Sequence, residues 1–264
     1  MKGFIQEYGN IIVVVAVILL MLLFGKTGYA KSIQDAILGS ADHIVETGEN
    51  ITKSDKKEVN VTAGDTLDIE GTKYVVLEEQ ENNQALVMTV SSIGDKRFQS
   101  NYNFNTGLRP DGQNANTYEG SDIDNYLEND WYNSLPSTMK AAIQSTSIKQ
   151  ASYATYNDPD SKQETGYNGQ VYNTISRHAF LPSISEIGKA VDLKNPDKGK
   201  SFLNGDYLWT RDSWQGDAGF AEFLSPNFGG LSINPAGTKN GVRPTFVIDL
   251  SQVDYKVAGH TDYK

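Results

Sequence analysis

The chain of 264 residues contains no cysteine. This absence excludes disulfide frameworks, thiolate nucleophiles, iron–sulfur clusters, cysteine-ligated zinc and lipid attachment through cysteine. Histidine is also scarce, because the whole chain has only His43, His178 and His260, which are far apart in sequence and lack the spacing of metal-ligand pairs. The chemistry that remains is that of carboxylates, hydroxyls, these few histidines, or recognition without catalysis.

Positive charge is in the minority, since 23 Lys and Arg stand against 33 Asp and Glu, for a formal net charge of −10. Binding to nucleic acid needs clustered Lys and Arg that neutralise phosphates, so we expect no nucleic-acid partner. Hydrophobic residues make up 38% of the chain, which is enough for a packed core. The length allows one large domain or two small ones.

Several familiar catalytic motifs are missing as well, among them GxSxG, HExxH, the P-loop and GxGxxG. Asp122, Asp124 and Asn125, or Asp158 and Asp160, carry oxygen ligands. Neither group has the glycine at the turn and the closing bidentate glutamate of a calcium loop. We therefore expect a protein that is not an enzyme and holds no metal ion and no cofactor.

The longest apolar run is Ile11–Phe24, with fourteen consecutive residues. A membrane-spanning helix needs about 20, and Phe4, Ile5 and Tyr8 extend the apolar character toward that length. We expect residues 1–30 to form a long hydrophobic helix that contacts the membrane or assembles with copies of the chain. The predicted location is the cell membrane, with a single pass and the C-terminal domain extracellular, or a cell-surface filament.

Three interpretations of this N-terminal segment stay open: an uncleaved anchor, a secretory signal peptide ending near Ala30, and a pilin-like assembly helix. The start MKGFIQEYG resembles the class III signal peptides of type IV pilins, and the pair Glu7 and Tyr8 resembles the Glu-Tyr pair of Flp-type pilins. That resemblance implies that Glu7 and Tyr8 are assembly residues. In it, the glutamate pairs with the N-terminal amine of a neighbouring copy inside a filament.

Residues 31–58 are predicted to connect this segment to the domain. Apolar residues at spacings of three and four predict an amphipathic stalk helix over Lys31 to about Glu46. The stretch 47–58 is polar and has no periodicity, so it is interpreted as a linker.

From Val59 onward the pattern changes to short strands, and the segments up to residue 92 predict an antiparallel meander. Helical stretches follow at 121–145 and from Ser183, and short strands return near the end. The predicted fold class is α+β, with an antiparallel sheet, two or more flanking helices and long loops. We expect this domain to span 59–252 and a tail to follow at 253–264.

Several blocks carry a resemblance to a known family. SDIDNYLENDWYNSLPSTMKAAI, HAFLPSISEIG and NGVRPTFVIDLS, in this order, resemble an uncharacterised family, domain of unknown function 6273, of exported Gram-positive proteins, over about 61–251. The segments Trp209-Thr210-Arg211 and Gly241-Val242-Arg243-Pro244 also resemble the closing part of C-type-lectin-like domains of the formylglycine-generating-enzyme type. This second resemblance implies a scaffold whose long loops carry recognition, without the cysteine chemistry of those enzymes.

Two sets of residues are candidates for ligand binding. The first is a polar–aromatic group near the end of the chain, made of Trp209, Arg211, Trp214 and Arg243. Arginine stacks on aromatic rings and binds carboxylates, so this group suggests a ligand site, while a purely structural role stays open. Tyrosines among Asn, Gly, Gln and Ser at 99–120 and 152–173 have the composition of binding loops. The candidates are Trp209, Arg211, Trp214, Arg243, Tyr102, Tyr118 and Tyr156.

The predicted function is a non-enzymatic recognition or structural module, tethered by its N-terminal helix to the membrane. Its ligand would be a glycan or a protein on another surface. Two alternatives stay open: a pilin-like subunit of a filament, and a hydrolase of cell walls or glycans that acts through carboxylates the sequence does not identify.

Overall fold

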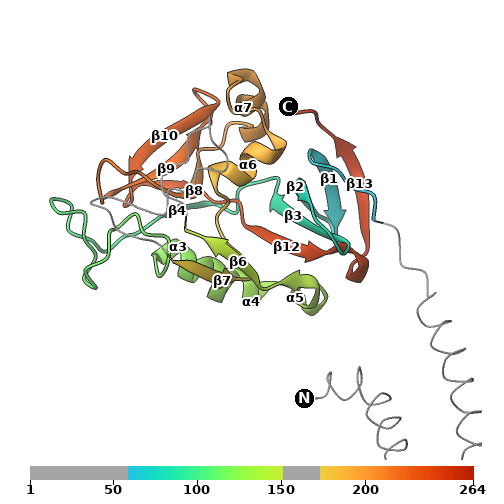
Figure 1. The fold of residues 1–264 in the computed structure, drawn as a ribbon, viewed down its shortest axis with the longest axis horizontal. Helices are drawn as coiled ribbons and strands as arrows, with labels where there is room; N and C mark the ends of the chain where they lie inside the picture. The colour runs from blue at the N-terminus through green and yellow to red at the C-terminus, as the bar shows by residue number, and fades with distance from the viewer. Residues whose placement is uncertain (1–58, 151–172) are drawn as a thin grey trace, which may run out of the picture. The chain divides into compact units, whose positions relative to one another are not determined.

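Three β-sheets form the framework of residues 59–150 and 173–264, which are the residues that the computed structural model describes (Figure 1). They belong to one compact unit, Lys57–Lys264. The predictions for residues 1–58, including Glu7, Tyr8 and the stalk helix, lie outside the described residues, as does Tyr156.

The largest sheet has six strands in the order β13-β1-β2-β3-β12-β5, and all neighbours are antiparallel. The predicted meander is confirmed by β1, β2 and β3. Its two turns place Glu70-Gly71 and Asn82-Asn83 at positive φ. In the two-residue turn between β1 and β2, positive φ is the conformation that a tight hairpin needs. The strands are β1 (Asp65–Ile69), β2 (Thr72–Glu79), β3 (Gln84–Thr89), β5 (Ile143–Gln144), β12 (Thr245–Asp249) and β13 (Tyr255–His260).

A second sheet has five strands in the order β10-β9-β8-β11-β4, and its β8–β11 pair is parallel. These strands are β4 (Asp95–Arg97), β8 (Leu208–Ser213), β9 (Phe220–Ser225), β10 (Gly230–Pro235) and β11 (Lys239–Gly241). A separate hairpin-like pair joins β6 (Thr146–Lys149) and β7 (Thr174–Arg177).

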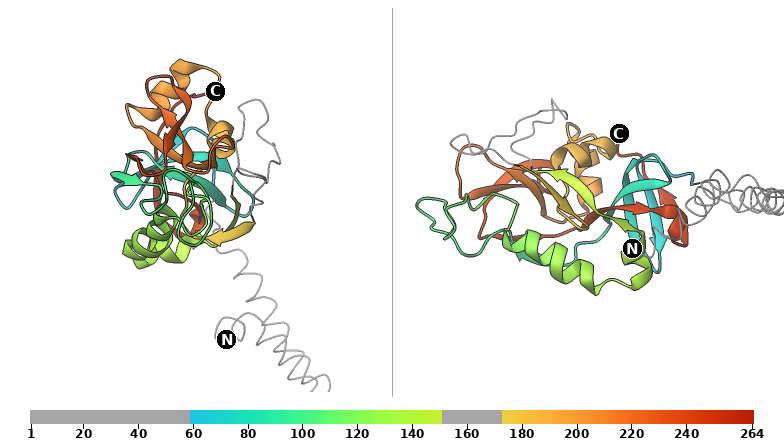
Figure 2. Two further views of the ribbon diagram at one scale, coloured as in Figure 1. Left: turned by 90° about the vertical axis from the view of Figure 1, so that its left-hand side faces the viewer. Right: turned by 60° about the horizontal axis from the view of Figure 1, so that its bottom comes forward.

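Short helices cover the sheets (Figures 1 and 2). Ser121 caps the first of them, and Ser183 forms a capping box with Glu186 at the start of α6, as residues of these types do at helix N-termini. The helical elements are α3 (Asp122–Asn125), the π-helix η1 (Tyr126–Trp131), α4 (Tyr132–Ser134), α5 (Ser137–Ala142), α6 (Ile184–Ala190), α7 (Pro196–Leu203) and the 3₁₀ turn η3 (Leu250–Gln252).

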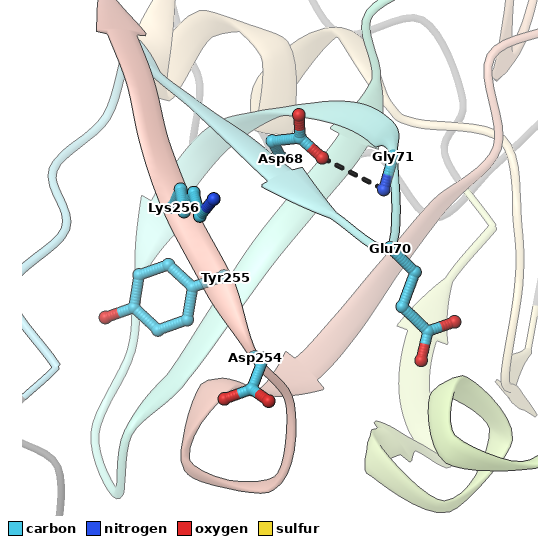
Figure 3. Close-up of a pocket in the computed structure, with 6 residues that line it drawn as sticks. All are labelled: Asp68, Glu70, Gly71, Asp254, Tyr255 and Lys256. Atoms are coloured by element: carbon cyan, nitrogen blue, oxygen red, sulfur yellow. Dashed lines mark hydrogen bonds between the residues drawn. The ribbon is translucent and has the colours of Figure 1, made fainter.

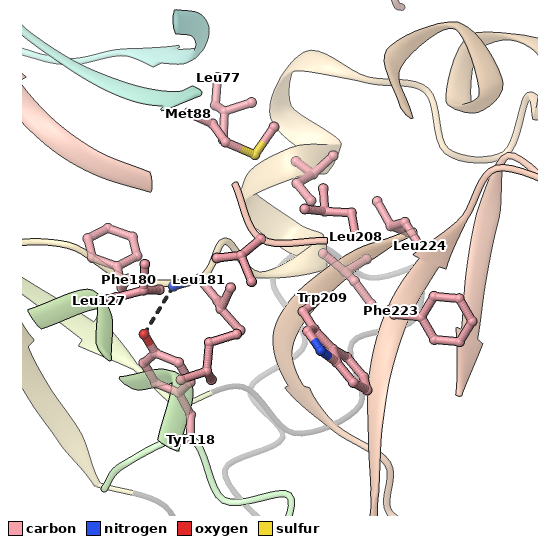
Figure 4. Close-up of a cluster of buried hydrophobic side chains, with 14 of the residues drawn as sticks. Leu77, Met88, Tyr118, Leu127, Phe180, Leu181, Leu208, Trp209, Phe223 and Leu224 are labelled. Carbon is pink, nitrogen blue, oxygen red and sulfur yellow. Dashed lines mark hydrogen bonds between the residues drawn. The ribbon is translucent and has the colours of Figure 1, made fainter. Parts of the chain in front are cut away.

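Both faces of the six-stranded sheet are buried. Along β2, Val75 and Leu77 belong to one hydrophobic cluster, while Tyr74 and Val76 belong to another, since successive side chains of a strand point to opposite faces. The first cluster also includes the side chains that Figure 4 shows converging from both large sheets and from α6, among them Trp209.

The predicted α+β, C-type-lectin-like fold class is wrong for the described residues. Most regular elements are strands, the helices are short, and two large sheets replace the single antiparallel sheet. The reason is that polar segments complete the sheets by pairing with distant strands. Residues 255–260, expected as part of a tail, form β13 and pair with β1, a contact that local apolar periodicity does not reveal.

The predicted single-pass membrane protein is not supported either. In the described ranges, no helix is both long enough and apolar enough to span a bilayer. The long hydrophobic helix predicted for residues 1–30 lies outside those ranges. The predicted membrane location with an extracellular domain is therefore withdrawn.

Candidate functional site: the loop end of the five-stranded sheet

A long loop, Ser100–Gly120, projects from the domain beside the connection between β8 and β9, as the green segment on the left of Figure 1 shows. It contains no helix or strand apart from isolated bridges. Its backbone nevertheless bonds to itself: Asn103 N–H donates to Leu108 O, 2.8 Å, and Arg109 N–H donates to Gln113 O, 2.8 Å. We call this loop, together with the connection at residues 214–219, the loop end of the sheet.

Asn116 fixes the loop to the sheet. Its side chain is buried, and its Nδ2 lies 2.7–3.0 Å from the carbonyl oxygens of Trp214, Asp217 and Phe220. Its backbone N–H donates to Ala218 O, 3.0 Å. One amide side chain therefore ties two segments that are about a hundred residues apart in sequence.

Gly107 allows the loop to approach this connection closely. It has φ +67°, and a Cβ atom there would overlap Ala218 and Gly219, so the position requires glycine. Farther out, the buried guanidinium of Arg109 donates to Glu119 O, 3.0 Å, and to Asp111 Oδ1, 3.3 Å. These contacts hold the loop in one conformation.

The loop presents apolar side chains to solvent. Phe104 lies in the turn between Asn103 and Leu108 and is 68% exposed, and Leu108 is also exposed. Among the described residues, the other highly exposed phenylalanine is Phe228, at 64%. It lies in the turn between β9 and β10, at the opposite end of these strands.

Tyr102 and Trp214 are the two sequence-predicted ligand residues that lie at the loop end. The ring of Tyr102 lies near Gly219 and Gly237, about 3.4–3.5 Å from where a Cβ on either glycine would stand. The ring of Trp214 lies over Gly216 and packs edge-on against Phe220. Both side chains are half-buried.

Trp209 and Arg211 lie in the core instead. Trp209 donates from Nε1 to Lys96 O, 2.8 Å, and its ring contacts Phe98 and Phe223 edge-on. The buried guanidinium of Arg211 binds both carboxylate oxygens of Glu186, at 2.5 and 2.6 Å.

Arg243 and Tyr118 are buried too. Arg243 donates to the carbonyl oxygens of Phe202 and Leu203, at 3.0 and 2.7 Å, and so closes the C-terminal end of α7. The Tyr118 hydroxyl accepts from Leu181 N–H, 3.1 Å, and burial raises the pKa of Tyr118 well above its usual value. A ligand role for the buried candidates stays a prediction, whereas their structural contacts are visible in the described fold.

Two buried carboxyl groups lie near each other on β8 and β9. Asp212 Oδ2 accepts from Ile184 N–H, 2.8 Å, whereas neither oxygen of Glu222 has a hydrogen-bond partner in the described structure. Burial, with a contribution from the charge of Asp212, raises the pKa of Glu222 to about 10. Burial also raises the pKa of Asp212 to about 7, opposed by the charge of Arg211. Glu222 is therefore a neutral acid at neutral pH.

The surface also has a shallow pocket of about 500 Å³ at the turn between β1 and β2, beside the start of β13 (Figure 3). Asp68 closes the turn by accepting from Gly71 N–H, 3.0 Å. In Figure 3 the side chains of Glu70 and Tyr255 point away from each other. No three His, Asp or Glu side chains of the described ranges are grouped so that they could hold a metal ion.

A comparison with known protein families identifies the family of this chain. Residues 82–250 match the model of a family described as a domain of unknown function, DUF6273, and the chain belongs to that family. No curated protein and no solved structure matches the chain.

Sequence reasoning located the loop but missed its principal residues. The Asn- and Gly-rich composition of this stretch points to its tyrosines and does not single out Phe104, Gly107 or Asn116. The only local sign of Phe104 is an aromatic residue between two asparagines. The role of Asn116 depends on carbonyl groups from the β8–β9 connection, which only the fold brings near.

Proposed function

We propose that this chain is a non-enzymatic recognition module that binds its ligand through the loop end of the five-stranded sheet. The observation that carries the proposal is that Phe104 stands 68% exposed on a loop fixed by buried contacts at Gly107, Arg109 and Asn116. Leaving a large apolar side chain in water is unfavourable by about 2 kcal/mol relative to burying it. A partner that covers Phe104 would recover this free energy.

The internal hydrogen bonds of the loop support the same function. A loop that is ordered before binding loses little conformational entropy when a ligand arrives, so its contacts contribute more fully to affinity. The surrounding side chains are mostly amides, including Asn101, Asn103 and Asn105. Aromatic anchors among adaptable amides are typical of binding loops.

The resemblances noted in the sequence guide the choice of ligands to test. The likeness to exported Gram-positive proteins favours cell-wall glycans. This likeness is part of the proposal. The filament alternative depends on Glu7 and Tyr8, outside the described residues, and it stays a prediction that no described contact favours.

An array of glycans and surface proteins, probed with the full chain and with Phe104→Ala, tests the proposal. We expect ligands bound by the wild-type chain to lose at least tenfold in affinity with Phe104→Ala, which corresponds to about 1.4 kcal/mol. Unchanged binding by the variant would place the ligand site elsewhere.

The hydrolase alternative has one observation in its favour. Asp212 and Glu222 have widely separated pKa values, a property of acid–base catalytic pairs. Both side chains are closed off from solvent, so a substrate does not reach them in this structure. Turnover of cell-wall fragments that disappears in Glu222→Gln, with the fold intact, would favour the hydrolase over the recognition module.

A further inference from the structure

Arg97 differs from the other arginines in its electrostatic surroundings. All arginines of the chain are among the described residues, and the others each form an ion pair with a carboxylate at 2.5–3.3 Å. These pairs are Arg109 with Asp111, Arg177 with Asp124, Arg211 with Glu186, and Arg243 with Asp206. No carboxylate of the described residues pairs with Arg97, although acidic residues outnumber basic ones in this chain.

The guanidinium of Arg97 is exposed but oriented. Arg97 ends β4, which is an edge strand of the five-stranded sheet. Its Nε donates to Gly237 O, 3.0 Å. The two terminal nitrogens have no acceptor in the described structure. Parallel N–H groups of this kind bind both oxygens of a carboxylate or phosphate group.

A second cation lies directly across the strand pair. Lys239 on β11 is opposite Arg97 in register, so the two side chains project from the same face. Lys239 is also exposed and has no carboxylate partner among the described residues. The acidic residue of β4, Asp95, is opposite Gly241 instead. Like charges that oppose each other in this way are unfavourable, and an anion bound between them would remove the repulsion.

These two cations adjoin the loop end of the sheet. The carbonyl that accepts from Arg97 belongs to Gly237, and the ring of Tyr102 lies about 3.5 Å from where a Cβ on that glycine would stand. Charged residues on an edge strand also discourage pairing with other sheets. That role needs charge alone, whereas the bond to Gly237 orients the Arg97 guanidinium beside an aromatic ring.

We propose that Arg97 and Lys239 form an oxyanion subsite beside the loop end, which takes a carboxylate or phosphate group of an anionic glycan. The guanidinium of Arg97 holds two oxygens of this group, and the ammonium of Lys239 binds it from the neighbouring strand. Tyr102 offers an aromatic surface to the adjacent part of the ligand. That the ligand is a glycan rests on the proposed function, whereas the anion subsite rests on the two cations.

Binding of the full chain to three polymers tests the subsite: polygalacturonate, its methyl ester, and poly(glycerol phosphate). The ester keeps the sugar backbone but removes its negative charge, and the third polymer distinguishes phosphate from carboxylate as the preferred group. We expect the wild type to bind at least one anionic polymer at least tenfold more tightly than the ester, because hydrogen bonds to charged groups are the stronger ones.

Two double variants with the same change of net charge locate the effect. Arg97→Gln combined with Lys239→Gln should lose at least tenfold in affinity for the preferred polymer. Lys194→Gln combined with Lys200→Gln removes two exposed lysines elsewhere and should stay within twofold of the wild type. Arg97→Lys keeps the charge but not the planar fork, and we expect roughly threefold weaker binding. Circular dichroism confirms that each variant is folded.

The proposal is overturned if the wild type binds neither anionic polymer more tightly than the ester, or if the two double variants lose equally. Phe104→Ala separates this inference from the proposed function. Losses with Phe104→Ala but none with the Arg97 and Lys239 variant would refute the subsite and leave the recognition loop standing. Losses with the Arg97 and Lys239 variant alone would support the subsite and refute the role of Phe104.

Discussion

At the residue scale, the most consequential group is a carboxyl that the fold keeps protonated. Glu222 is 0% exposed and its pKa is raised to about 10. An unpaired buried carboxylate is far more costly than the neutral acid. Folding therefore holds a proton on Glu222 that the unfolded chain releases once the pH exceeds the ordinary glutamate value of 4.5.

This proton predicts how stability depends on pH. Between about pH 5 and pH 9 the folded state binds more protons than the unfolded state, so the free energy of unfolding falls as the pH rises, by up to about 1.4 kcal/mol per pH unit for Glu222. Glu222→Gln keeps the shape of the side chain and removes the titration. We expect urea unfolding of this variant to show a shallower pH dependence than the wild type.

The matched control is Glu81→Gln, the same side-chain replacement at an exposed position. It should follow the wild-type pH profile. If Glu222→Gln and Glu81→Gln have the same profile, Glu222 does not carry a buried proton.

Sequence reasoning has its clearest limit at this same scale. A tryptophan or arginine with distinctive neighbours is equally consistent with a ligand site and with an internal contact, and Trp209 and Arg243 illustrate this. The carbonyl oxygens that they contact belong to Lys96, Phe202 and Leu203. Only the folded chain brings these partners together, so the sequence could name the residues but not their surroundings.

At the scale of elements, local sequence patterns predicted the strands and helix starts that depend on interactions between residues close in sequence. The strands β1 to β3 follow apolar alternation and turn residues, and the capped start of α6 follows Ser183. β13 was not predicted because nearly all of it is exposed and shows no buried alternation, and its partner β1 is about 190 residues away in sequence. The stability of such a strand comes from backbone pairing with a distant segment rather than from its own side chains.

Two helices give a paired prediction at this scale. In α7, Gly199 packs against the β9–β10 turn, and a Cβ there would overlap the backbone of Gly229. We expect Gly199→Ala to lower the free energy of unfolding by roughly 1–3 kcal/mol, since the turn must move. In α6, a Cβ at Gly188 meets nothing within 4 Å. Gly188→Ala should therefore stabilise by up to about 1 kcal/mol, because alanine is the better helix former.

Thermal or urea unfolding of both variants checks this pair. Opposite signs are expected from the same chemical change in two short helices. A Gly199→Ala variant as stable as wild type would mean that α7 and the β9–β10 turn are not in close contact.

At the scale of the whole molecule, the recognition surface and the largest sheet are separate parts of the fold. The recognition surface lies at the loop end of the five-stranded sheet, and the six-stranded sheet contains the β1–β3 meander and the C-terminal strand β13.

The central claim is that Phe104 on its fixed loop contacts the ligand. It is tested most directly by titrating one ligand, identified on the array, into the full chain and into Phe104→Ala and Phe228→Ala. Both variants remove a phenylalanine that is about two-thirds exposed, at 68% and 64%, so general loss of apolar surface is matched. The account predicts a Kd raised at least tenfold by Phe104→Ala and unchanged within twofold by Phe228→Ala. Equal Kd values for wild type and Phe104→Ala, or a loss confined to Phe228→Ala, would contradict it.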